Sequence, residues 1–354
     1  MFPRLLITGG SGFIGSNFVR HILSVRPGTH ITNIDALTYS GNRENLADLE
    51  HHPLYTFVHA DICDADRIRP LVANADAIVH FAAESHVDRS ILDTRPFIRT
   101  NVLGTQTLLD AAVAAKLHRF IHISTDEVYG SLPLDRRDLR FTEVSAIKPN
   151  SPYAASKAAS DMLVRAAHHT FGLNTSITRC SNNFGPYQFP EKVIPLFVTN
   201  LVENKQVPLY GDGLNVRDWI HVEDHCEAIL AVLERGGSGE VYNIGADNEQ
   251  SNLDLTRTIL NILGKGDGFI RHVEDRLGHD RRYAIDSSKI QRELNWHATR
   301  SAWPDALIST VDWYVKHPDW WHRIKSGAYR DFHDKLYTNR PDAAPAAPRK
   351  RLAR

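Results

Sequence analysis

The chain has 354 residues, of which 42% are hydrophobic and 23% are charged, and its formal net charge is -1. This composition is typical of a globular protein, and the near-neutral charge gives no bulk attraction to nucleic acid or to an anionic membrane. Three scattered cysteines exclude a disulfide framework and a zinc site, and no apolar run reaches the roughly 18 residues of a membrane helix. We therefore expect a cytoplasmic protein with no metal, no nucleic-acid partner and no membrane segment.

The first half of the chain repeats a short apolar strand, a turn and a helical pattern. The strands are expected at residues 4–8, 30–35, 56–59, 77–81, 119–124 and 174–179. This alternation predicts an α/β fold, a Rossmann-type doubly wound parallel sheet with helices on both faces. Residues 101–116 carry apolar side chains at helical spacing, which predicts a helix that faces the core.

After residue 180 the rhythm changes to a stretch dense in proline, asparagine and aromatic residues, which predicts an ordered loop. We place there the start of a smaller α/β domain that binds the substrate. The expected division is 1–180 for the first domain, with a strand and helix in 214–242 returning to it, and 181–213 with 243–330 for the second. Residues 341–354 are rich in proline and alanine and then basic, which predicts a disordered tail; the alternative is a segment that binds an anionic partner.

A glycine-rich turn follows the first strand. Gly10, Gly12 and Gly15 have the spacing G-x-G-x-x-G between a strand and a helix, which brings backbone N–H groups against a pyrophosphate. Asp35 ends the second strand, where a carboxylate accepts hydrogen bonds from ribose hydroxyls and repels a 2'-phosphate. The pattern therefore predicts NAD rather than NADP, and the alternative is a tight turn without a ligand.

Two later strand ends fit the same site. Asp61 and Ile62 follow the third strand, and the small residues Ala82 and Ala83 follow the fourth. Ligands of open α/β sheets bind at the carboxyl ends of the strands. These residues are therefore expected to line the dinucleotide site.

Tyr153 and Lys157 lie four residues apart at the start of a helix, so they share one helix face. A lysine ammonium beside a phenol is expected to lower the phenol's pKa below its usual value of about 10, which lets tyrosine act as a base near neutrality. Ser124 and Thr125 end the preceding strand and offer hydroxyl donors. The set predicts removal of an alcohol proton as hydride passes to nicotinamide, and the alternative is an exposed helix face.

Asp126 and Glu127 add two carboxyl groups that a simple alcohol oxidation does not use. Oxidation to a ketone acidifies the neighbouring C–H, so one carboxylate can remove that proton while a protonated carboxyl group protonates a departing hydroxyl. This predicts loss of water. The alternative is that Asp126 caps a turn and Glu127 is solvated.

Longer motifs carry a family resemblance, among them TGGSGFIGS, HISTDEVYGS, SPYAASKAASD, SNNFGPYQFPEK and GHDRRY. To about residue 325 the chain resembles the extended short-chain dehydrogenase/reductase superfamily, and within it the dTDP-glucose 4,6-dehydratase family. The resemblance implies that Tyr153 removes the C4 hydroxyl proton, Glu127 takes the C5 proton and Asp126 protonates the C6 hydroxyl. It further implies that Thr125 bonds the C4 oxygen, that Lys157 also holds the nicotinamide ribose, and that the chain forms a homodimer through helices 100–116 and 154–169.

The resemblance also implies two sets of binding residues. The NAD-binding set is Gly9, Gly12, Phe13, Ile14, Gly15, Asp35, Leu37, Thr38, Asp61, Ile62, Phe81, Ala82, Ala83, Ser85, Thr100, Tyr153, Lys157 and Asn183. The set for the nucleotide sugar is Ser85, Thr125, Asn182, Lys192, Val193, Pro208, Leu209, Tyr210, Arg217, Asn252, Asp275, Arg276 and His279. Arg217 can bind a diphosphate bidentately, Tyr210 is expected near the nucleobase, and the alternative for Arg217 is a surface salt bridge.

Three other functions compete with a dehydratase for dTDP-glucose. A dehydratase for UDP- or GDP-sugars would need the same catalytic residues and a different base pocket. A nucleotide-sugar 4-epimerase needs no leaving hydroxyl, so Asp126 and Glu127 count against it. A non-catalytic NAD-sensing protein would not need the Tyr153 and Lys157 pair or the carboxyl groups.

Overall fold

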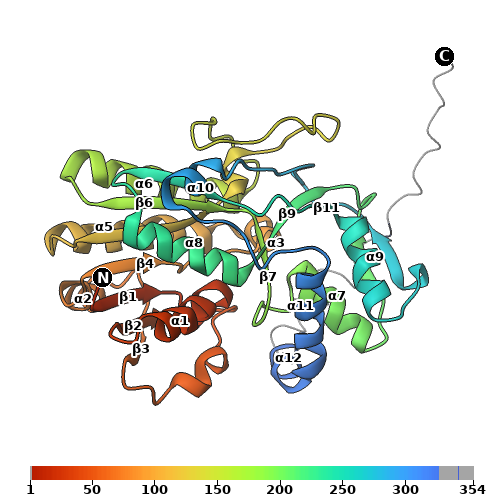
Figure 1. The fold of residues 1–354 in the computed structure, drawn as a ribbon, viewed down its shortest axis with the longest axis horizontal. Coiled ribbons are helices and arrows are strands. Elements are labelled where there is room, and N and C mark those ends of the chain that lie inside the picture. Colours follow the sequence, from red (N-terminus) through yellow and green to blue (C-terminus); the bar gives the residue numbers. More distant parts are fainter. Residues whose placement is uncertain (1, 327–341, 343–354) are drawn as a thin grey trace.

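Seven parallel strands form the large sheet of the computed structural model, which describes residues 2–326 and 342 (Figure 1). Their order across the sheet is β10-β6-β5-β4-β1-β2-β3. The bounds are β1 (Arg4–Thr8), β2 (His30–Asp35), β3 (Tyr55–His59), β4 (Ala77–His80), β5 (Arg119–Thr125), β6 (Thr175–Cys180) and β10 (Glu240–Ile244). The first six coincide with the predicted strands to within one residue at each end, and the expected Rossmann-type α/β fold is confirmed.

Helices cover both faces of this sheet because its strands alternate their apolar side chains between the two faces. Ile7 of β1 packs with one core cluster and its neighbour Leu6 with the other. One face is covered by α1 (Phe13–Val25), α8 (Val222–Arg235) and α10 (Ser288–Leu294). The other face is covered by α2 (Ala65–Ala73), α5 (Thr105–Ala114) and α6 (Pro152–Phe171).

The predicted helix 101–116 is two elements in the structure. A π-helical segment, η2 (Ile98–Gly104), runs directly into α5. Asn101 in this segment holds the loop after β4, because its side chain donates to the Glu84 carbonyl at 3.0 Å and accepts from the Glu84 N–H at 2.9 Å. The wider π-helical turn therefore holds the loop after β4, where the sequence predicts part of the cofactor site.

Smaller sheets and four helices form the second part of the molecule (Figure 1). One sheet has the order β11-β9-β7 and the other pairs β12 with β8. Their bounds are β7 (Asn182–Phe184), β8 (Val207–Tyr210), β9 (Val216–His221), β11 (Glu249–Ser251) and β12 (Ile270–Val273). The helices α7 (Val193–Val202), α9 (Asn252–Ile262), α11 (Asp305–Lys316) and α12 (Pro318–Ile324) pack into a core of their own with Trp219, Trp320 and Trp321.

The segment 214–242 is divided between the two parts of the molecule. We expected its strand to return to the first sheet, but β9 pairs with β7 and β11 because its Trp219 joins the core of the second part. Its helix α8 does pack on the large sheet, and β10 extends that sheet at its edge. The proposed domain division stays a prediction, and the expected tail 341–354 lies outside the described residues except for Asp342.

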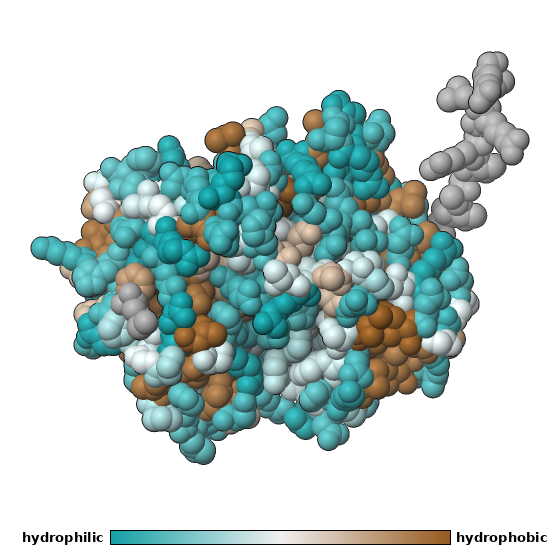
Figure 2. All heavy atoms as spheres, in the orientation of Figure 1, coloured by the Kyte–Doolittle hydropathy of each residue, from teal (hydrophilic) through white to brown (hydrophobic). Residues whose placement is uncertain are grey.

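Short helical turns complete the described chain. They are η1 (Arg43–Leu49), α3 (Val87–Leu92), α4 (Arg95–Phe97), η3 (Asp126–Tyr129) and η4 (Asp267–Phe269). None of the described helices is long and apolar enough to cross a membrane. The face drawn in Figure 2 is largely hydrophilic, with separate apolar areas.

Candidate active site

The glycine turn after β1 closes so tightly that Gly9 and Gly15 leave no room for a side chain. A Cβ on Gly9, whose φ is +73°, would lie 2.6 Å from the backbone nitrogen of Ala82. A Cβ on Gly15 would lie 2.3 Å from the carbonyl oxygen of Gly9. The turn therefore presents bare backbone and the N-terminus of α1, which suits the pyrophosphate of a dinucleotide.

Asp35 lies buried at the end of β2, and backbone N–H groups hold its carboxylate. Its two oxygens accept from the N–H of Ser11 at 2.9 Å and of Leu37 at 2.8 Å. Burial raises the pKa of Asp35, and these two hydrogen bonds oppose the rise. The carboxylate is thus oriented before any ribose hydroxyl reaches it.

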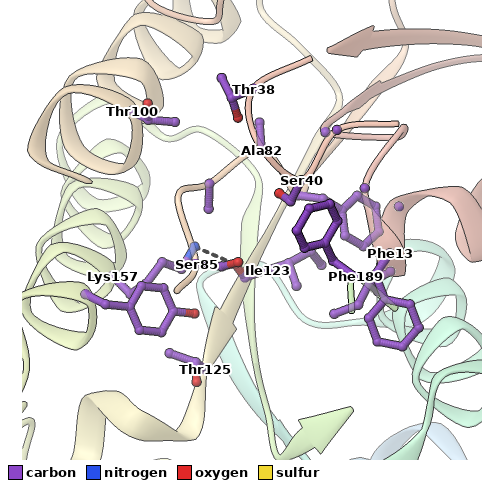
Figure 3. Close-up of a pocket in the computed structure, with 18 of the residues that line it drawn as sticks. Phe13, Thr38, Ser40, Ala82, Ser85, Thr100, Ile123, Thr125, Lys157 and Phe189 are labelled. Atoms are coloured by element: carbon purple, nitrogen blue, oxygen red, sulfur yellow. Dashed lines mark hydrogen bonds between the residues drawn. The ribbon is translucent and has the colours of Figure 1, made fainter. Parts of the chain in front are cut away.

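A cavity at the carboxyl ends of the large sheet, which we name the cofactor cavity, gathers the predicted NAD-binding residues. All of them line it except Leu37, whose backbone orients Asp35 instead. Figure 3 shows Lys157, Ser85 and Thr125 on one side of this cavity and Phe13 and Phe189 on the other. The residues fit a dinucleotide, because the glycine turn, Asp35 and the small residues after β4 lie around one space.

Tyr153 and Lys157 project from the first turns of α6 toward the end of β5. The helix begins here because Ser151 accepts the N–H of Ala154 at 3.1 Å and Pro152 occupies the first helical position. The Lys157 ammonium donates to the carbonyl of Ile123 at 2.7 Å. Burial lowers the pKa of Lys157 to about 8.

The pKa of Tyr153 is raised in the structure, whereas the sequence predicts that Lys157 lowers it. Burial raises the pKa of Tyr153 well above its usual value, the negative charge of Glu127 adds to the rise, and the Thr125 hydroxyl opposes it. The effect of burial outweighs the lowering that was expected from Lys157. The expected low pKa of Tyr153 is therefore wrong for the chain by itself.

Asp126 lies in η3, immediately after β5, and its side chain is only 2% exposed. One oxygen accepts from the Thr125 hydroxyl at 3.4 Å, whereas the other, Oδ2, is buried without a hydrogen-bond partner among the described residues. Burial raises the pKa of Asp126 well above its usual value, and the nearby charges of Glu127 and Asp218 add to the rise. Thr125 caps η3 by accepting the N–H of Glu127 at 3.3 Å, so the alternative in which Asp126 caps the turn is wrong.

Glu127 has a different electrostatic surrounding from its neighbour. Burial raises its pKa, and the positive charges of Arg276, Arg217 and Lys192 oppose that rise. The side chain is part-buried and lines two cavities, so it is not a solvated surface group. Two adjacent carboxyl groups held in unlike environments are the arrangement that separates an acid from a base.

A second cavity, which we name the sugar cavity, adjoins the first and gathers the predicted nucleotide-sugar residues. Its walls include all of them except Thr125, which lines the cofactor cavity, and Asp275. Asp275 instead pairs with Nδ1 of His279 at 2.5 Å. The two cavities share the wall residues Ser85, Glu127, Asn182, Glu191 and Lys192.

Three cations face the sugar cavity. Arg217 is buried, donates to the carbonyls of Val216 at 2.8 Å and Asp280 at 2.9 Å, and lies 4.2 Å from the centre of a tyrosine ring. The alternative of a surface salt bridge for Arg217 is therefore wrong. Arg276 keeps a buried Nε without a partner among the described residues, and Lys192 donates to the Ser85 carbonyl at 3.0 Å. Such a set suits a diphosphate.

Several wall residues were not predicted. The cofactor cavity also includes Tyr39, Ser40, Arg99, Phe189 and Glu191, and the sugar cavity includes His86, Asp88, Phe197, Trp219 and Tyr283. Most of them lie on loops or in the second part of the molecule, whereas the sequence reasoning followed the strand ends. Phe189 and Glu191 lie in the motif SNNFGPYQFPEK, and this motif is the sequence signal that could have identified them as wall residues.

Comparisons with known proteins agree with this geometry. The profile of the family described as GDP-mannose 4,6 dehydratase matches residues 6–303. A dTDP-glucose 4,6-dehydratase from Streptomyces niveus is 54% identical over 327 residues, which cover 91% of this chain and 96% of that protein. The structure of the dTDP-glucose 4,6-dehydratase DesIV from Streptomyces venezuelae, with NAD and TYD bound, is similar with a TM-score of 0.88 and 52% identity, covering 91% of this chain and 100% of the other.

A more distant likeness defines the wider superfamily. A UDP-glucuronic acid 4-epimerase from Bacillus cereus has a TM-score of 0.83 at 28% identity, over 88% of this chain and 99% of the other. The scaffold is thus shared with epimerases, while the higher identity is to dehydratases. The chain belongs to the GDP-mannose 4,6 dehydratase family of extended short-chain dehydrogenases/reductases, and within it to the dTDP-glucose 4,6-dehydratases.

Proposed function

We propose that this chain is an NAD-dependent dTDP-glucose 4,6-dehydratase, which converts dTDP-glucose to dTDP-4-keto-6-deoxyglucose and water. The observation that carries the proposal is the pair Asp126 and Glu127, of which Asp126 lines the cofactor cavity and Glu127 lines both cavities. Asp126 offers a buried carboxyl oxygen without a described partner, and Glu127 faces three cations. Membership of the dehydratase family supports the same reaction.

The cofactor would be held by the residues of the cofactor cavity. The glycine turn would bind the pyrophosphate and Asp35 the adenosine ribose hydroxyls. NAD supplies the chemistry of accepting hydride from C4 of the sugar and returning it to C6. A positive charge near Tyr153 lowers the pKa of its phenol. The positively charged nicotinamide ring of NAD would therefore add to the effect of Lys157 on this pKa.

The side chains would divide the remaining steps. Tyr153 accepts the proton of the C4 hydroxyl, and the Thr125 hydroxyl donates to the C4 oxygen. Glu127 then removes the C5 proton while Asp126 gives its proton to the C6 oxygen, so that the C5–H and C6–O bonds break, a C5=C6 double bond forms and water leaves. The raised pKa of Asp126 favours the protonated acid that this step needs.

The direct test is mass spectrometry of the product after purified protein and NAD are incubated separately with dTDP-, UDP- and GDP-hexoses. Loss of one water from dTDP-glucose alone would support both the reaction and the base specificity. Water loss from a UDP- or GDP-sugar instead would assign another dehydratase. Unchanged mass with every sugar would refute a dehydratase, and NMR would then test for a 4-epimerase.

We also propose that the chain forms a homodimer through α5 and α6. Leu103 just before α5 and Met162 on α6 are exposed, as is Ile98 in the π-helical segment. Exposed apolar side chains on neighbouring helices suit burial against a second copy. Light scattering that gives the monomer mass would refute this arrangement. The cytoplasmic location stays a prediction.

A further inference from the structure

Helix α12 lies against the first part of the molecule through a buried hydrogen bond. The indole Nε1 of Trp320 donates to Oδ1 of Asn45 at 3.0 Å, although the two residues are 275 positions apart. Trp320 is 7% exposed and Asn45 is 2% exposed. An ion pair between Arg323 and Glu44 at 2.7 Å adds a second contact at the surface.

The same asparagine continues to the glycine turn. Its Nδ2 donates to the carbonyl of Ser11 at 2.9 Å, and the N–H of Ser11 donates to Oδ2 of Asp35 at 2.9 Å. A row of hydrogen bonds thus connects Trp320 to the carboxylate at the end of β2. An indole N–H only donates, so it fixes the amide with Oδ1 toward Trp320 and Nδ2 toward Ser11.

The other side of α12 is attached to the second part of the molecule. Lys325, the residue after the helix, donates to Thr199 and Asn200 at 3.3 Å and to Glu203 at 2.9 Å, at the end of α7. Helix α7 starts directly after Lys192, which lines both cavities. Figure 1 shows α7, α11 and α12 grouped in this part of the molecule. Helix α12 therefore connects the wall of the sugar cavity with the turn of the cofactor cavity.

We propose that Trp320 and Asn45 are positioning residues that hold the glycine turn in its dinucleotide-binding form, so that α12 sets how long NAD stays bound. This inference rests on the NAD binding in the proposed function. The proposed reaction returns its hydride to the sugar and leaves NAD unchanged, so slow release of NAD does not limit turnover. The hydrogen bonds that connect Trp320 through Asn45 to the glycine turn would make the release of NAD slow.

The test is the exchange of bound NAD in purified holoenzyme against labelled NAD, in the unmutated protein and in Trp320→Phe. Phenylalanine keeps most of the packing and removes the N–H donor. We expect exchange to be faster by roughly 2- to 12-fold, the range for one net hydrogen bond. The N–H of Asn42 also donates to the Ser11 carbonyl at 3.0 Å, which is why we expect faster exchange rather than loss of binding.

Trp321→Phe is the matched control. Its indole also donates a buried bond, to the Tyr314 carbonyl at 2.9 Å, from the neighbouring position of the same helix. Both variants should lower the melting temperature, but only Trp320→Phe should speed exchange. Equal exchange in both variants, or unchanged exchange in Trp320→Phe, would overturn the proposal.

A second variant covers the case in which Trp320→Phe does not fold. Asn45→Asp keeps the side-chain shape and an acceptor for Trp320, but it cannot donate to Ser11. It should speed NAD exchange at least as much, and unchanged exchange would again overturn the proposal. An unmutated protein that retains no NAD would instead contradict the proposed function itself.

Discussion

The substitution Asp126→Asn tests the assignment of the acid. Asparagine keeps the shape and the contact with Thr125, but it has no proton to give to the C6 oxygen. The carboxyl group is 2% exposed and its Oδ2 has no described partner, so solvent has little access to replace the lost acid. The expected effect is therefore on the elimination step and not on folding or cofactor binding.

The size of the effect follows from the role and the burial. A well-placed acid contributes about 10²- to 10⁴-fold in rate, or about 3 to 5 kcal/mol of transition-state stabilisation. Because solvent is excluded from Asp126, we expect the upper part of this range, about 10³- to 10⁴-fold. Asp138→Asn is the control, since that exposed carboxylate pairs with Arg136 at the surface, away from both cavities, and should leave the rate unchanged.

The assay compares two readouts in deuterated water. Loss of water is followed by mass spectrometry, and deuterium at C5 is measured in recovered dTDP-glucose. In Asp126→Asn, Glu127 still removes the C5 proton, so deuterium should enter C5 while water loss is slow; in Glu127→Gln both should be slow. Water loss from Asp126→Asn at the unmutated rate, or loss of its NAD, would refute the assignment.

Three further predictions concern the cofactor turn and pH. Gly15→Ala places a Cβ 2.3 Å from the Gly9 carbonyl oxygen and should abolish NAD binding measured by calorimetry. Gly28→Ala is the control, because its Cβ would have no atom within 4 Å and the variant should bind NAD normally. Equal NAD binding by the two variants would contradict the tight geometry of the turn. Burial lowers the pKa of His80 to about 3, so below pH 6.5 the unfolded chain binds a proton that the folded chain does not. The free energy of unfolding should then fall by about 1.4 kcal/mol per pH unit on acidification, and His80→Gln should reduce that slope in urea titrations; an identical slope would show that His80 is not responsible. Burial lowers the pKa of Lys157 to about 8, so the rate of water loss should fall above that pH as the ammonium is lost, and a rate that is flat to pH 10 would exclude the charged form as essential.

Local patterns predicted six of the seven strands of the large sheet because each of these is a short apolar run between turns, whereas the edge strand β10 was not predicted. They also predicted the glycine turn and Asp35, since both are fixed by nearby sequence. The position of β9 could not be predicted in this way, because its partners β7 and β11 are short strands whose pairing depends on the packing of Trp219. The pairing of the strands in the small sheets therefore could not be predicted from local sequence patterns.

The site was predicted more completely than its electrostatics. Asp126 and Glu127 were identified as a pair, but their unlike surroundings come from residues distant in sequence: Asp218 near Asp126, and Arg276 and Lys192 near Glu127. The pKa of Tyr153 was expected to fall, because spacing alone does not show that the phenol is buried and lies near the negative charge of Glu127. Burial and partner choice are properties of the assembled fold.

The wall shared by the two cavities limits how substrate preference can be altered. A substitution at Lys192 or Ser85 would disturb both ligands at once, because each lines both spaces. Pro208, Leu209 and Tyr210 line only the sugar cavity. Libraries at these three positions should therefore leave the cofactor cavity unchanged, and they would test the prediction that Tyr210 lies near the nucleobase.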